Sequence, residues 1–191
     1  MDKIPKKALM TKEYIKEMDE NLKETARLLK GFNWTINGGT LLGKIRHNDY
    51  VPWDDDIDIK LSIPKNKVKI LTDKLDKEGT RYRKSTFGLQ LFGKRPYVDI
   101  FLLDDNFKFH NPKISKQMGE VEPTMIKNKI VKGKFRGIPI RMPTKKASIE
   151  YLDAQYNKRG SPDWRTTGVV WNHKFKPKPK LIVELPKKKG L

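Results

Sequence analysis

The chain contains no cysteine, few histidines and no long apolar stretch. The lack of cysteine excludes disulfide bonds, thiolate zinc sites and a cysteine nucleophile. Three scattered histidines, His47, His110 and His173, make a poor metal cluster. No apolar run approaches the roughly 20 residues that span a bilayer, and the first residues lack the apolar core of a signal peptide. We therefore expect a soluble, cytoplasmic protein with no transmembrane segment.

Acidic residues are also scarce relative to basic ones. The 191 residues include 42 Lys and Arg against 23 Asp and Glu, which gives a formal net charge of +19. This excess favours a polyanionic partner, such as nucleic acid, a nucleotide or an anionic membrane surface, without choosing among them. The length predicts one domain over residues 1–173, followed by a basic Lys/Pro-rich arm over 174–191. The arm is either a solubilising segment or an attachment to an anionic surface or nucleic acid.

Hydrophobic periodicity predicts an α/β (α+β) domain, with a mixed β-sheet flanked by helices. Apolar residues recur every three or four positions from Thr11 to Lys30, which is typical of one helix face. The alternation in "DIDIKLSI" is typical of a strand with one buried face. Further elements are expected as a strand over 32–37, a helix over 65–78, two strands within "LQLFGKRPYVDIFLLD", a hairpin over 129–143 and a helix starting near Thr144.

Four aspartates fall within five residues: Asp54, Asp55, Asp56 and Asp58. Asp56 and Asp58 are two apart on the predicted strand, so their carboxylates point the same way from Cα atoms about 6.6 to 6.8 Å apart. Alternation turns Asp55 away from this pair. Asp99, in the apolar strand "YVDIF", is the candidate third carboxylate, unless an arginine simply holds it there. Three such oxygen ligands predict a Mg²⁺ or Mn²⁺ site that supports phosphoryl transfer, although a solvated acidic face is the simpler alternative.

A glycine turn precedes the acids in the sequence. Gly38 and Gly39 stand just before a predicted short helix, where backbone N–H groups and the positive helix end can bind phosphate, with the Thr40 hydroxyl beside them. A tight turn without a ligand is the alternative. Positive charge for a transferring phosphate is available from Arg46, together with Lys44 or His47.

The order Gly-Gly, Asp-apolar-Asp-apolar and a later apolar-Asp-apolar strand resembles the polymerase-β-type nucleotidyltransferase superfamily. Longer blocks are closely similar to the LicD family, which includes fukutin and fukutin-related protein. The blocks are "GGTLLGKIRHNDYVPWDDDIDI", "YVDIFLLD" and "IPIRMPTKKASIEYLDAQYNKRGSPDW". They follow the family's order and extend to about Trp164, so the basic arm is left unmatched.

This resemblance implies a nucleotidyltransferase fold and a Mg²⁺-dependent enzyme. Such an enzyme transfers a phosphorylated alcohol, such as phosphocholine, ribitol phosphate or glycerol phosphate, from a CDP-linked donor to a glycan hydroxyl. The matching positions are the metal pair Asp56 and Asp58, the third acid Asp99, the phosphate turn Gly38, Gly39 and Thr40, and the supporting or donor-binding residues Asp54 and Arg46.

Two other functions remain open from the sequence. The first is a nucleotidyltransferase that uses an NTP on an RNA, protein or small-molecule acceptor. The second is a catalytically inactive basic module that binds nucleic acid. Many family members are longer than this chain, which leaves the acceptor undetermined.

Overall fold

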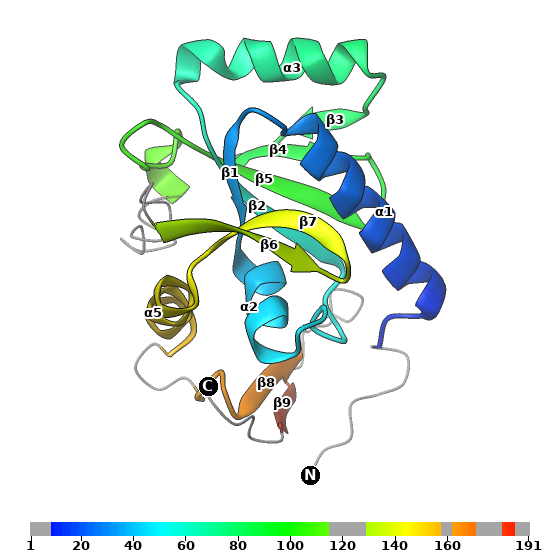
Figure 1. The fold of residues 1–191 in the computed structure, drawn as a ribbon, viewed down its shortest axis with the longest axis vertical. Helices are drawn as coiled ribbons and strands as arrows, with labels where there is room; N and C mark the ends of the chain where they lie inside the picture. The colour runs from blue at the N-terminus through cyan, green and yellow to red at the C-terminus, as the bar shows by residue number, and fades with distance from the viewer. Residues whose placement is uncertain (1–8, 115–128, 158–161, 171–180, 186–191) are drawn as a thin grey trace.

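The computed structural model describes residues 9–114, 129–157, 162–170 and 181–185 (Figure 1). Its helices and strands follow the predicted order, with three short strands, β3, β8 and β9, that periodicity did not predict. The elements are α1 Lys12–Leu28, β1 Asn33–Ile36, α2 Gly38–Arg46, β2 Asp56–Ser62, η2 Lys65–Lys67, α3 Val68–Lys77, β3 Tyr82–Lys84, β4 Gly88–Leu91, β5 Tyr97–Leu103, β6 Ile130–Phe135, β7 Ile138–Pro143, α5 Lys145–Tyr156, β8 Thr167–Val170 and β9 Leu181–Glu184.

Five strands form a mixed sheet in the order β1-β2-β5-β4-β3. The central strands β2 and β5 run parallel, and the remaining neighbours are antiparallel. In β2 the apolar residues Ile57, Ile59 and Leu61 are fully buried. The intervening Asp56 and Asp58 therefore lie on the opposite face of the sheet. The predicted α/β architecture with a mixed sheet is confirmed.

The predicted first helix forms as α1. Its N-cap Thr11 accepts a hydrogen bond from the backbone N–H of Tyr14, and Met18 and Leu22 on its apolar face are fully buried. The predicted helix over 65–78 is divided into the one-turn η2 and α3. Pro64, in an extended conformation, is the N-cap of η2, and η2 leads directly into α3.

Residues 129–143 form the predicted hairpin, β6–β7. Its turn is Arg136-Gly137, where both residues have positive φ, as a two-residue hairpin turn requires. Helix α5 then begins at Lys145, because the side chain of Thr144 accepts a hydrogen bond from the backbone N–H of Ala147. In Figure 1 the hairpin crosses the sheet and α5 lies beside α2.

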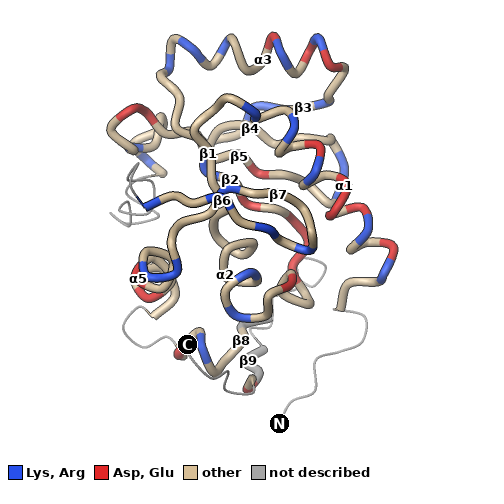
Figure 2. The backbone as a smooth tube through the Cα atoms, in the orientation of Figure 1, with Lys and Arg blue, Asp and Glu red and all other residues tan. Residues whose placement is uncertain are grey.

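Charged residues are distributed unevenly over the fold. Figure 2 shows acidic and basic residues alternating along α1 and α3, whereas the segment entering β2 is acidic. Among the described helices, none combines the length and the apolar character that a membrane crossing requires. Most of the predicted basic arm lies outside the described residues; within it, β9 pairs antiparallel with β8.

Candidate active site

Strand register places the three predicted acids on one face of the sheet. Asp58 on β2 lies directly opposite Asp99 on the parallel strand β5, and Asp56 precedes Asp58 by one strand repeat. Directly opposite residues point to the same face of a sheet, so all three carboxylates share one face. The alternation of acidic and apolar residues explains this placement, since the apolar neighbours are in the core.

The first turn of α2 packs against these acids. The backbone N–H of Gly39 donates to Asp58 Oδ2 at 2.7 Å, and the Thr40 hydroxyl accepts from the backbone N–H of Asp58 at 2.9 Å. A Cβ at Gly38 would overlap the Asp58 carboxylate, and one at Gly39 would overlap Asp54. Glycine is required here because the acids approach the helix backbone closely. A role for this turn in binding donor phosphate stays a prediction.

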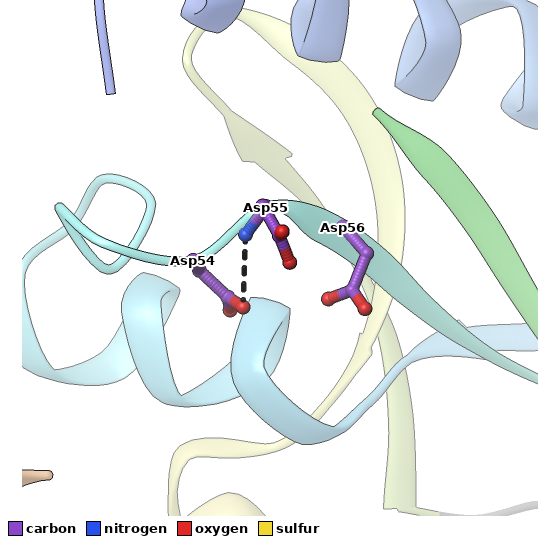
Figure 3. Close-up of side chains that lie close together, drawn as sticks. All are labelled: Asp54, Asp55 and Asp56. Atoms are coloured by element: carbon purple, nitrogen blue, oxygen red, sulfur yellow. Dashed lines mark hydrogen bonds between the residues drawn. The ribbon is translucent and has the colours of Figure 1, made fainter. Parts of the chain in front are cut away.

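Asp55 joins the acidic cluster (Figure 3). Asp54, Asp55 and Asp56 each offer a carboxylate oxygen within 4.8 Å of the others. The backbone N–H of Asp55 donates to Asp54 Oδ1 at 3.2 Å, and the Asp55 carboxylate forms an ion pair with Arg95. The expectation that Asp55 turns away was wrong, because β2 begins only at Asp56 and strand alternation does not extend to the residue before it.

The acids lie in an environment that opposes ionisation. Burial, reinforced by neighbouring carboxylates, raises the pKa of Asp54 and Asp58 well above their ordinary value. Burial and the charge of Asp99 raise the pKa of Asp56 to about 6, and burial raises the pKa of Asp99. A divalent cation would remove this penalty, and carboxylate oxygens are the ligands that Mg²⁺ prefers. The donor set therefore fits such an ion.

Gln90 on β4 is a site residue that the sequence interpretation missed. It lies opposite Asp99 in the strand register, and its Nε2 donates to Asp99 Oδ1 at 2.7 Å. Its Oε1 is buried without a hydrogen-bond partner among the described residues. Gln90 stands between Leu89 and Leu91, both buried, so the same polar-between-apolar pattern that marked Asp99 also marks this glutamine.

A buried cation, Lys60, lies on the acid-bearing face of β2. Its exposed fraction is 2%, and its Nζ lies 4.5 Å from the centroid of the Tyr151 ring on α5. The positive charge of Lys60 lowers the pKa of Asp58, which partly offsets the effect of burial. Strand alternation from Asp58 predicts this orientation, but composition alone gave no reason to expect a buried lysine.

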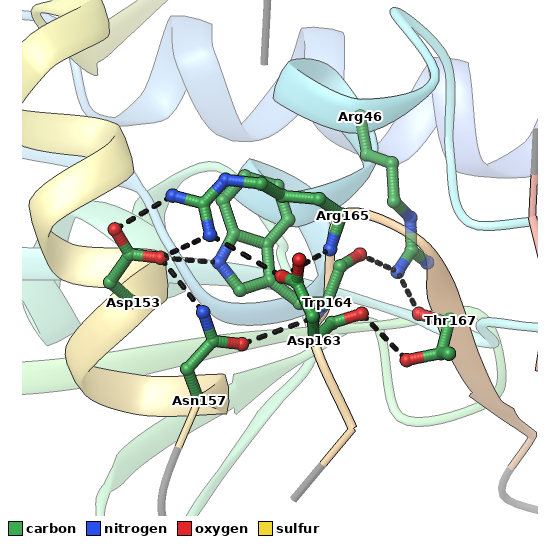
Figure 4. A network of polar contacts seen from close by, with 7 residues as sticks. All are labelled: Arg46, Asp153, Asn157, Asp163, Trp164, Arg165 and Thr167. Atoms are coloured by element: carbon green, nitrogen blue, oxygen red, sulfur yellow. Dashed lines mark hydrogen bonds and ion pairs between the residues drawn. The ribbon is translucent and has the colours of Figure 1, made fainter. Parts of the chain in front are cut away.

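Arg46 lies at the other end of α2, in the polar network of Figure 4. Its Nη1 donates to the backbone carbonyls of Trp164, at 2.9 Å, and Thr167, at 3.1 Å. Burial lowers the pKa of Arg46 to about 10, and this value is still high enough that the guanidinium is charged at neutral pH. These contacts make Arg46 an anchor between α2 and the 163–167 turn, whereas its predicted contact with the donor stays a prediction.

The two alternative basic residues near Arg46 have separate partners. Lys44 Nζ donates to Asn48 Oδ1 at 2.6 Å, and His47 Nε2 accepts from Arg46 Nε at 2.9 Å. In this structure, therefore, both side chains support the end of α2, and their predicted action on a phosphate remains a prediction.

The sequence matches the model of a protein family over residues 31–145, more than half of the chain. That family is described as LicD/FKTN/FKRP, nucleotidyltransferase domain. The lipopolysaccharide cholinephosphotransferase LicD of Haemophilus influenzae is 56% identical over 27 residues, which cover 14% of this chain and 10% of that protein.

Two solved structures match this chain in the structural comparison. An antigenic nucleotidyltransferase-like protein from Paracoccidioides brasiliensis has a TM-score of 0.50 and 14% identity, covering 82% of this chain and 72% of that one. ANT(2'')-Ia in complex with adenylyl-2''-tobramycin has a TM-score of 0.43 and 17% identity, covering 72% of this chain and 77% of that one. The first of these likenesses agrees with the predicted nucleotidyltransferase fold.

Proposed function

Because the chain belongs to the LicD/FKTN/FKRP family of nucleotidyltransferase domains, we propose that it is a transferase acting on a nucleotide-linked donor. It moves a phosphorylated alcohol, such as phosphocholine or ribitol phosphate, from a CDP-alcohol to a glycan hydroxyl. The observation that carries this proposal is the register of β2 against β5, which sets Asp58 opposite Asp99 at the first turn of α2.

Asp56, Asp58 and Asp99 would hold Mg²⁺ or Mn²⁺, with Asp54 close enough to share in binding. When bound, such an ion neutralises phosphate charge and lowers the pKa of a coordinated oxygen nucleophile. Two features support this assignment. The charge of Asp99 raises the pKa of both Asp56 and Asp58, and all three side chains offer hard oxygen ligands.

The residues around the acids have separate roles in the proposed reaction. The first turn of α2 orients the donor phosphates, with positive charge from its helix end. The acceptor oxygen forms a bond to the phosphorus of the alcohol phosphate, the bond from that phosphorus to the CMP oxygen breaks, and CMP leaves. Asp99 accepts the hydroxyl proton directly or through water, and its raised pKa suits it to that role.

The test is incubation of the protein with Mg²⁺ and a panel of CDP-alcohols, CTP and the other NTPs, with CMP and pyrophosphate measured separately. The proposed reaction releases CMP from at least one CDP-alcohol. Release of pyrophosphate from an NTP, without CMP from any CDP-alcohol, would instead identify nucleotidyl transfer. A parallel reaction with EDTA shows whether the activity needs a metal.

A further inference from the structure

A row of polar residues crosses the sheet from the acids to the edge strand β3. Asp58 lies opposite Asp99, Asp99 opposite Gln90, and Gln90 opposite Arg83. Residues in such a row point to one face, so Arg83 shares the face of the acids. Adjacent strands are about 4.8 Å apart, so the Cα atoms of Asp99 and Arg83, which are two strands apart, are separated by about 10 Å. An extended arginine side chain covers most of that distance.

The ring of Tyr97 orients two guanidinium groups beside the acids. The Cζ atom of Arg83 lies 5.4 Å from the ring centroid, and that of Arg95 lies 5.7 Å from it. Tyr97 is itself opposite Asp56 in the β2–β5 register. Cation–π contacts are worth about 0.5 to 1 kcal/mol at exposed sites, and they order a guanidinium without using its N–H donors.

The N–H donors of Arg83 are open to a ligand. The Arg83 side chain is exposed and makes no hydrogen bond or ion pair with the described part of the chain. Arg95 is ion-paired with Asp55 but is also exposed. Between Arg83 and Asp99, the buried Oε1 of Gln90 has no partner among the described residues. A ligand that binds Arg83 therefore needs an anionic group.

We propose that Arg83, Arg95 and Tyr97 form an anion-binding subsite for a phosphate carried by the acceptor. A guanidinium binds phosphate through two parallel N–H donors, and stacking on an aromatic ring leaves that edge available.

The assignment to the acceptor rests on the proposed function, which puts the donor phosphates at Gly38 and Gly39. Asp99 lies between that turn and Arg83 in the strand order, because β5 separates β2 from β4 and β3. The reacting hydroxyl would approach Asp99 from the β3 side. The acceptor is then a phosphate-bearing polyol or sugar.

Titration of inorganic phosphate into the Mg²⁺-loaded protein, followed by NMR of the arginine Nε–Hε signals, tests the subsite. Arg83→Gln should weaken phosphate binding about tenfold, and Arg83→Lys should restore part of the loss. Lys84→Gln is the matched control, because it removes the same charge at the next residue, on the other face of β3. Tyr97→Leu should weaken phosphate binding about threefold, since both guanidinium groups remain but lose the aromatic ring that orients them.

The same titration with saturating CDP separates the acceptor from the donor. Phosphate should still bind, and Arg83→Gln should leave the affinity for CDP unchanged. Displacement of phosphate by CDP, or equal weakening of both ligands by Arg83→Gln, would assign the subsite to the donor and overturn the proposal. Equal effects of Arg83→Gln and Lys84→Gln would also overturn it. Phosphate binding that depends on Arg83, in a protein that does not bind CDP, would support the subsite and contradict the proposed CDP-linked donor.

Discussion

Charge lies at both ends of helix α2, partly buried at the N-terminal end and buried at the C-terminal end, and the protein accommodates it differently at each end. At the N-terminal end, Asp54, Asp56 and Asp58 lie close together, and the pKa of each of the three carboxyl groups is raised. At the C-terminal end, Arg46 donates to two backbone carbonyls. Negative charge at the N-terminal end and positive charge at the C-terminal end both interact favourably with the helix dipole, so the dipole does not account for the difference.

The groups that contact the charges account for the difference between the two ends of α2. The turn that receives Arg46 is itself tied to α5, because Trp164 Nε1 donates to Asp153 Oδ1 at 2.9 Å and Arg165 forms an ion pair with Asp153 (Figure 4). Paired charge of this kind fixes the scaffold. Like charges held together by the fold retain a penalty that a cation can relieve, which is the electrostatic signature of a functional site.

The largest expected effect comes from Asp58→Asn at the N-terminal end of α2. This change removes a proposed metal ligand, and we expect transfer activity to fall by at least about 10³-fold. The free energy of unfolding without metal should stay the same or rise, because a partly buried carboxylate, repelled by its neighbours, is replaced by an amide that still accepts from Gly39. Initial rates and urea unfolding measure the two effects, and substantial remaining activity would remove Asp58 from the metal site.

Arg46→Ala should have the reverse pattern at the C-terminal end, with a loss of stability. One buried and one partly buried carbonyl lose a charged donor, so the free energy of unfolding should fall by about 2 to 4 kcal/mol. Lys44→Ala, on the same helix, is the control and should change stability by no more than about 0.5 kcal/mol. Urea unfolding compares them. If Arg46→Ala keeps its stability but raises the KM for the donor, the predicted donor contact is correct and the anchoring role is wrong.

The pH dependence of stability provides a third contrast. The pKa of Asp56 is raised from 3.8 to about 6 in the folded state, so its contribution to stability is present below about pH 4 and is lost as pH rises through about 6. Mg²⁺ favours the ionised carboxylates and should reverse this loss. At about 100 times its Kd, the ion would add about 2.7 kcal/mol. We therefore expect Mg²⁺ to raise Tm more at about pH 7.5 than at about pH 5.

Asp58→Asn should reduce this Mg²⁺-dependent rise in Tm, and Arg46→Ala should preserve it. Calorimetry of all three proteins at both pH values gives the comparison. A rise in Tm that is the same at both pH values would mean that Mg²⁺ binds away from the acids.

Strand alternation predicted most of the acid face from the sequence, because the period of two is local. It predicted that Asp56 and Asp58 share a face and that Asp99 lies on a buried strand. The parallel register that sets Asp58 opposite Asp99 depends on chain contacts far apart in sequence, so local periodicity had no access to it. The partner of Arg46 was hidden for the same reason, since its hydrogen bonds reach 118 and 121 residues along the chain. Gln90 is different, because its alternation was visible and only its chemistry was overlooked.

Gln90→Leu is expected to have the smallest effect, and it tests whether the acid face extends beyond its charged residues. Asp99 would lose the donor that holds Oδ1, and loss of such an orienting partner typically costs about 10- to 100-fold in activity. Stability should change by less than about 1.5 kcal/mol, because the lost hydrogen bond is partly offset by removal of the unpartnered Oε1. Ser148→Ala is the control, since it removes one buried hydrogen bond, to the carbonyl of Pro143, on helix α5. If both variants lose stability and neither loses activity, Gln90 is part of the scaffold, and the boundary between functional and structural polar groups lies at Asp99.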